Sequence, residues 1–173
     1  MNSELKILAM FSAWLVFLLI TFFLTTFIPQ RCLAQKIMAT QKIKEVEIDI
    51  EPGLCPNPLN VESQGTLPVA ILGTLDLNIA NINPQTIKLE GVRAVQYRRE
   101  DVSTTVFDRQ DICDCTIEGK DGMIDLVLEF NISDVVSTIG QVDNDDVAVL
   151  TITGSLFDGT PIEGEDCVVI QKP

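Results

Sequence analysis

Residues 124–132, IDLVLEFNI, carry the clearest strand pattern in this chain. Apolar side chains recur at every second position, and in a β-strand such positions share one face of the pleat. We therefore expect one face to pack in a core, with the members Ile124, Leu126, Leu128, Phe130 and Ile132. The opposite face is expected to hold Asp125, Val127, Glu129 and Asn131.

Further strands are predicted earlier in the chain. Residues 46–51, VEIDIE, alternate apolar and acidic side chains, which predicts one buried and one wet face. Residues 67–73, LPVAILG, are continuously apolar, as is typical of a short strand covered on both faces. Because proline donates no ladder hydrogen bond, Pro68 is expected near the start of that strand or at a free edge.

Three more strand-like segments, 86–90, 147–157 and 167–170, are separated by turn signals such as Asn83-Pro84 and Asp158-Gly159. No stretch after residue 40 shows a sustained helical period. Short strands between regular turns indicate an all-β fold. We expect a single antiparallel β-sandwich over residues 43–173, an immunoglobulin-like two-sheet architecture, after an N-terminal apolar leader helix.

The leader is the uncharged and almost wholly apolar run of residues 7–28. It is long for the apolar region of a signal peptide and long enough to span a bilayer. Cys32 and Ala34 supply small residues for cleavage before Gln35. Two interpretations stay open: residues 1–34 are a signal peptide, or residues 7–28 are a retained N-terminal anchor and the sole membrane contact. Both predict a flexible lead-in at 35–42 and an extracellular, periplasmic or cell-surface domain.

The charge of the chain excludes several partners. The whole sequence has 12 basic and 25 acidic residues, and residues 1–34 hold Lys6, Arg31 and Glu4. Residues 35–173 therefore keep 10 basic and 24 acidic side chains, a formal charge of −14. Such a surface repels nucleic acid and anionic lipid headgroups. The chain has no histidine, so it offers neither a Ser-His-Asp triad nor a histidine-ligated zinc site.

Four cysteines remain beyond the leader: Cys55, Cys113, Cys115 and Cys167. An even count in an exported chain indicates disulfides. Pairing Cys113 with Cys115 is sterically poor, because their side chains leave an extended backbone in parallel. We therefore expect Cys55 and Cys167 to pair with Cys113 and Cys115, in either order. A thiolate metal site is the competing interpretation, although the spacing is not CxxC.

Residues 118–125, EGKDGMID, match the second half of a calcium loop of the form DxNxDGxxD. Ile117 and Gly119 stand where the first Asp and the Asn are expected. One interpretation is a simple Asp-Gly hairpin turn. The other is a weak calcium site formed by Glu118, Asp121 and Asp125, with millimolar to submillimolar affinity typical of extracellular modules.

A carboxylate-based hydrolase is a further alternative, since glycoside hydrolysis uses two acids that face each other across a sugar cleft. Tyr97 is the one tyrosine, and the one tryptophan lies in the leader, so no acid pair has an aromatic platform beside it. We therefore expect no enzyme.

Four motifs occur in order: IDIEPG at 48–53, LPVAILGT at 67–74, DGMIDLVLEF at 121–130 and LFDGTPIEG at 156–164. Together they resemble a module common in exported bacterial and archaeal proteins. The resemblance implies a β-sandwich at the cell surface or outside the cell, often part of a larger secreted protein, with no established reaction. The chain departs from the module in the calcium-like loop, where Cys113 and Cys115 are expected to fix the loop instead. The expected role is to bind an unidentified extracellular partner or surface component, or to contribute to surface structure.

Overall fold

The computed structural model of the chain describes residues 42–172. The predicted leader of residues 1–34, with its apolar run at 7–28, lies outside the described residues, as do the lead-in residues 35–41. Within residues 42–172, no helix has the length and apolar character needed to cross a membrane.

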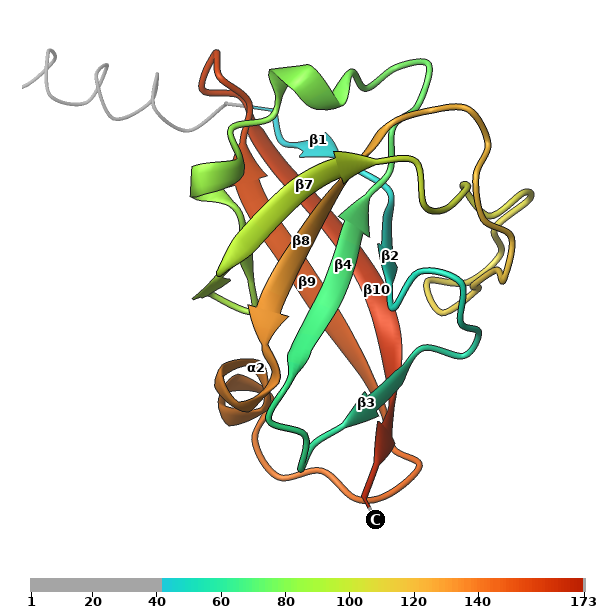
Figure 1. Ribbon diagram of the computed structural model, residues 1–173, viewed down its shortest axis with the longest axis vertical. Coiled ribbons are helices and arrows are strands. Elements are labelled where there is room, and N and C mark those ends of the chain that lie inside the picture. Colours follow the sequence, from blue (N-terminus) through green and yellow to red (C-terminus); the bar gives the residue numbers. More distant parts are fainter. Residues whose placement is uncertain (1–41, 173) are drawn as a thin grey trace, which may run out of the picture. The chain divides into compact units, whose positions relative to one another are not determined.

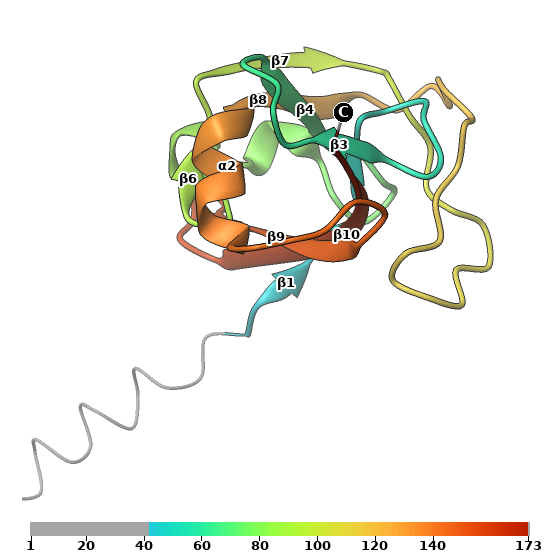
Figure 2. The same cartoon turned by 90° about the horizontal axis from the view of Figure 1, so that it is seen from below.

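Two β-sheets pack face to face (Figures 1 and 2). Sheet A has the strand order β1-β10-β9-β5-β6, and β3 also pairs with β10. Its strands are β1 (Lys44–Glu45), β3 (Pro58–Asn60), β5 (Lys88–Leu89), β6 (Val92–Arg93), β9 (Val147–Ser155) and β10 (Pro161–Gln171). Sheet B has the order β2-β4-β8-β7 and contains β2 (Ile48–Ile50), β4 (Thr66–Ile71), β7 (Gln96–Glu100) and β8 (Asp125–Asn131).

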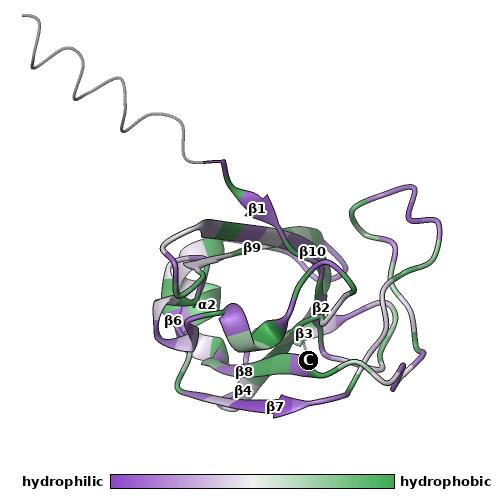
Figure 3. Ribbon diagram, turned by 90° about the horizontal axis from the view of Figure 1, so that it is seen from above, coloured by the Kyte–Doolittle hydropathy of each residue, from purple (hydrophilic) through white to green (hydrophobic). Residues whose placement is uncertain are grey.

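The core lies between the sheets. Leu126, Leu128 and Phe130 of β8 are at most 1% exposed and share one cluster with Leu150 and Ile152 of β9. On the other face of sheet B, Ala70, Leu72 and Val127 form a small second cluster. The central strand β4 is therefore covered on both faces, as its continuous apolar run predicts. In Figure 3, β4 and β8 are coloured mainly hydrophobic, whereas β7 at the sheet edge is coloured hydrophilic.

The all-β prediction is confirmed, but several details were wrong. Both β1 and β3 run parallel to β10, so sheet A is mixed rather than antiparallel. The segment expected as a strand at 86–90 is mostly other structure: the 3-10 helix η2 (Pro84–Thr86) precedes the two residues of β5. A second 3-10 helix, η1 (Ile79–Asn81), packs Ile79 into the core. These short elements leave little periodicity to detect.

The helix α2 (Ile132–Ile139) directly follows β8 and was missed. It buries Ile132 and Val135, so Ile132 reaches the core from a helix and not from a strand. At the opposite end of β8, Ile124 is 52% exposed, although alternation placed it in the core. Pairing with β4 and β7 stops at Leu126 and Asp125 respectively, so no neighbouring strand covers Ile124.

The N-terminal segment changes sheets between β1 and β2. β1 pairs with β10 in sheet A, whereas β2 pairs with β4 in sheet B. Val46 donates from its N–H to the carbonyl of Glu163 at the start of this crossing. Asp49 of β2 is nonetheless only 6% exposed, because its side chain contacts Ser103 in the connection between β7 and β8. The prediction that the acidic face of residues 46–51 is exposed to water is therefore wrong for Asp49.

Gly164 of β10 lets residues 46–47 between β1 and β2, which we call the crossing segment, approach closely. A Cβ at this position would lie 2.5 Å from the carbonyl oxygen of Val46 and 3.0 Å from Ile48 Cγ2. We predict that Gly164→Ala lowers the free energy of unfolding by at least about 2 kcal/mol, because a backbone contact cannot move aside as a side-chain tip can. Gly119→Ala is the control, since its Cβ would lie 3.7 Å from the nearest atom. Urea unfolding checks both, and equal midpoints would refute the close approach.

Candidate functional site

The candidate site is the long connection between β7 and β8, residues 101–124, which we call the pinned loop. It contains no helix or strand. Irregular loops longer than about 12–15 residues are uncommon in compact domains and often carry function. Figure 1 shows the pinned loop projecting from the side of the domain on which β2 and β10 lie.

Two disulfides fasten the pinned loop to the sandwich. Cys115 is bonded to Cys55 in the connection between β2 and β3, and Cys113 is bonded to Cys167 in β10. This pairing is one of the two that the sequence leaves open. It joins the pinned loop to segments that lie 60 and 54 residues away in the sequence. Each bridge contributes about 2–4 kcal/mol by restricting the unfolded chain. The cysteines beside the calcium-like segment therefore hold the loop in place.

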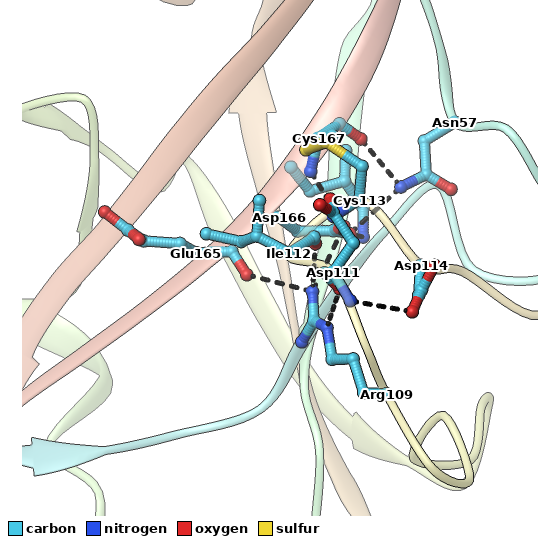
Figure 4. Close-up of a disulfide and its surroundings, with 10 residues drawn as sticks. Asn57, Arg109, Asp111, Ile112, Cys113, Asp114, Glu165, Asp166 and Cys167 are labelled. Atoms are coloured by element: carbon cyan, nitrogen blue, oxygen red, sulfur yellow. Dashed lines mark hydrogen bonds and ion pairs between the residues drawn. A yellow bond between two sulfur atoms is a disulfide. The ribbon is translucent and has the colours of Figure 1, made fainter.

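Arg109 is the polar centre of the pinned loop (Figure 4). Its Nη1 lies 2.9 Å from Glu47 Oε2 in the crossing segment, and its Nη2 donates to the carbonyl of Glu165 in β10 at 3.5 Å. Its Nε and Nη2 also donate to the carbonyls of Asp111 and Ile112 within the loop. One guanidinium thus connects three segments. No sequence motif marks it, because its partners are distant in the chain and mostly main-chain atoms.

Asp166 lies beneath this arginine on the inner face of β10. Its Oδ2 accepts hydrogen bonds from the N–H of Ile50 and from Asn57 Nδ2, both at 2.9 Å, and its Oδ1 lies 3.9 Å from Arg109 Nη2. Burial raises the pKa of Asp166 above its ordinary value. Asn57 also donates to the carbonyl of Cys167, while its buried Oδ1 has no partner within residues 42–172.

Asp49 and Ser103 form a second buried contact between β2 and the pinned loop. The Ser103 hydroxyl donates to Asp49 Oδ2, and both residues are at most 6% exposed. Burial raises the pKa of Asp49 to about 6; the bond from Ser103 opposes this rise, and the neighbouring carboxylates of Asp166 and Asp125 add to it. An ionised Asp49 at neutral pH is therefore held at a free-energy cost.

Asp125, predicted as a calcium ligand, has another role. Its Oδ1 accepts from the N–H of Gly73, and its Oδ2 accepts from the N–H groups of Val102 and Ser103, at 2.9–3.3 Å. The side chain thus ties the start of the pinned loop to the strands of sheet B. It is 1% exposed, and burial raises its pKa.

The other two predicted ligands do not join it. Asp121 is exposed and accepts from the N–H of Met123, as in a tight turn, and Glu118 is exposed without a side-chain hydrogen bond in the described part. Across residues 42–172, no three Asp, Glu, Cys or His side chains converge on one metal-sized site. The three predicted ligands are not gathered at one point in this structure, and calcium binding stays a prediction from sequence.

An open groove of about 520 Å³ lies where the pinned loop meets β1 and β10. We call it the acidic groove. Its charged lining residues are Glu45, Glu47, Asp111, Glu163, Glu165 and Arg109. All of them except Arg109 are acidic, and Arg109 already pairs with Glu47. Sequence reasoning missed this site, because its acids come from three separate segments.

Comparisons with known protein families, with curated proteins and with solved structures give no match for this chain. The resemblance to the exported module therefore stays a prediction from its four motifs.

The raised pKa of Asp49 predicts an unusual pH dependence. Between pH 3.8, the ordinary pKa of an aspartate, and about pH 6, the Asp49 carboxyl is protonated in the folded state but ionised in the unfolded state. The contribution of Asp49 to stability therefore falls as pH rises through this window. We predict that Asp49→Asn, which removes this penalty, gains about 2 kcal/mol more relative to wild type at pH 7.5 than at pH 4.5.

Urea unfolding of both proteins at the two pH values measures this difference. Asp76→Asn is the matched control, because Asp76 is exposed and its carboxylate accepts no hydrogen bond in the described part. A gain for Asp49→Asn that does not depend on pH would contradict the assignment.

Asp125 yields a second prediction. Asp125→Asn replaces one acceptor oxygen by an NH₂ group that faces main-chain N–H donors, so buried donors lose their partner. We expect the free energy of unfolding to fall by about 2–4 kcal/mol. Asp121→Asn should change it by no more than about 0.5 kcal/mol, because that side chain is exposed and an amide oxygen preserves its turn. Similar unfolding midpoints for the two variants would show that Asp125 does not hold the pinned loop.

Proposed function

We propose that this chain is an exported, non-catalytic binding or surface-structure module. Its two packed sheets form an immunoglobulin-like sandwich behind an N-terminal apolar leader helix. The observation that carries the proposal is the pair of disulfides that fastens the pinned loop. Structural disulfides persist in oxidising compartments and are rare where thiol reductants are abundant.

The architecture supports a binding role. Binding residues are commonly found on loops that a rigid scaffold positions. The pinned loop is fixed at Cys113 and Cys115, yet it leaves Phe107 97% and Ile117 72% exposed. Large apolar side chains presented by a covalently fixed loop lose little freedom when a partner covers them.

Export is tested by chemistry at the cysteines. We predict that the exported protein, denatured and alkylated without reductant, shows no free thiol among Cys55, Cys113, Cys115 and Cys167. Proteolysis should then release peptides joined as Cys55–Cys115 and Cys113–Cys167. A reduced sample is the control and should show all four thiols. Four free thiols in the unreduced protein would reject the proposed compartment.

The same preparation decides what becomes of the leader. An N-terminus at Gln35 in the intact mass indicates a cleaved signal peptide and a secreted module. A mass that includes residues 1–34, together with recovery in the membrane fraction, indicates the anchored form of the same domain.

A further inference from the structure

The free edge of sheet B lies at β7. All five residues of β7 are exposed, and among the described residues only β8 pairs with it. Its outer backbone therefore offers N–H and C=O groups to another chain. Tyr97 in β7 and Val95 just before it are 50% and 56% exposed, which adds apolar surface at this edge.

Cations lie beside this edge, where the chain passes from β6 of sheet A to β7 of sheet B. Lys88 and Arg93 face each other across the β5–β6 ladder, and Arg98 and Arg99 follow in β7. Arg98 is held by Glu100 and Glu129 at 3.0 and 2.8 Å, whereas Lys88, Arg93 and Arg99 have no ion pair among residues 42–172. We call these three residues, with Val95 and Tyr97, the basic corner.

Repulsion between like charges destabilises the basic corner, and an acidic partner would relieve this repulsion. Like charges that lie directly opposite each other in a β-ladder destabilise it, and Lys88 and Arg93 are such a pair. The whole chain, by contrast, is strongly acidic, with 25 acidic and 12 basic residues. A cationic surface on so acidic a protein is therefore complementary to the rest of the same protein.

The acidic groove lies at the other end of sheet A. Its walls come from β1, β10 and the pinned loop, whereas β5 and β6 end the strand order on the opposite side. Figure 2 shows β6 and the pinned loop on opposite sides of the domain. Val46 and Ile112 add apolar atoms to the groove, which suits the exposed Val95 and Tyr97.

We propose that the basic corner of one copy docks in the acidic groove of a second copy of this chain. Unpaired cations then meet unpaired carboxylates, and the free edge of β7 is covered. The two surfaces differ and lie on opposite sides, so the contact is heterologous and continues from copy to copy in a row or ring. This inference rests on the proposed surface-structure role and names its partner.

Sedimentation velocity of the purified exported protein tests the contact. At roughly 0.01 M salt the Debye length is about 30 Å, and at roughly 1 M it is about 3 Å. The sedimentation coefficient of wild type should rise with concentration at low salt and stay at the monomer value at high salt. A monomer at every concentration up to millimolar at low salt would overturn the proposal.

Two neutralised variants then test the geometry. Arg93→Gln/Arg99→Gln removes the corner charges and Glu163→Gln/Glu165→Gln removes the groove charges, so each variant alone should remain monomeric. Mixed in equal amounts, they retain one intact corner and one intact groove, and should form a 1:1 dimer and nothing larger. Variants that assemble like wild type, or a mixture that stays monomeric, would overturn head-to-tail docking.

Lys120→Gln and Asp143→Asn are the matched controls, because they change exposed charges outside both surfaces and should self-associate like wild type. Melting temperatures no lower than that of wild type establish that all variants fold. The thiol count and the N-terminal mass do not depend on association. A failed docking test with intact disulfides therefore leaves the proposed export standing, whereas free thiols reject export alone.

Discussion

Buried carboxylates hold this domain together at the points where strand pairing ends. Asp166 accepts the N–H of Ile50 just after the chain has crossed from one sheet to the other. Asp125 accepts N–H groups from both Gly73 and the start of the pinned loop. Burying a carboxylate is unfavourable, and here main-chain donors offset part of that cost through charge-assisted hydrogen bonds, although burial still raises the pKa of both side chains. These contacts decide where the irregular segments lie, and so the shape of the candidate site depends on them.

Side chains also take the place of a missing strand along β10. β1 pairs with this strand at residues 162–163 and β3 pairs at 169–171, which leaves a gap between them. Arg109 donates to the carbonyl of Glu165 and Asn57 donates to the carbonyl of Cys167 within that gap. Main-chain carbonyls that would otherwise be open to another chain are thereby satisfied internally. The acidic groove beside this gap presents side chains rather than a free sheet edge.

The regular parts of the fold could be predicted from sequence, because their signal is local. The apolar run of β4 and the alternation in β8 each reflect a strand and its immediate cover, and both were placed correctly apart from their ends. The set of disulfides followed from an even count and the poor geometry of a Cys113–Cys115 pair. Their order depends on distances in space, which the count does not contain.

The site was harder to predict, because its residues act through distant main-chain atoms. Asp49 was expected in water, since alternation assumes that one face of the strand meets solvent, but the pinned loop covers this face through Ser103. Asp125 fits a calcium motif by spacing but is turned towards main-chain donors. Arg109 belongs to no pattern. The helix α2 has only eight residues, too few for a period to stand out after a strand.

The disulfides also determine how the domain would respond to tension. Cys55 is joined to Cys115, Cys115 lies two residues from Cys113, and Cys113 is joined to Cys167, so a short covalent path links residue 55 to residue 167. An extended chain lengthens by about 3.5 Å per residue, but the residues between those two positions are bypassed. A pull on the two ends can stretch only the short flanking segments. The oxidised domain would therefore behave as a nearly inextensible link, whatever becomes of its sheets.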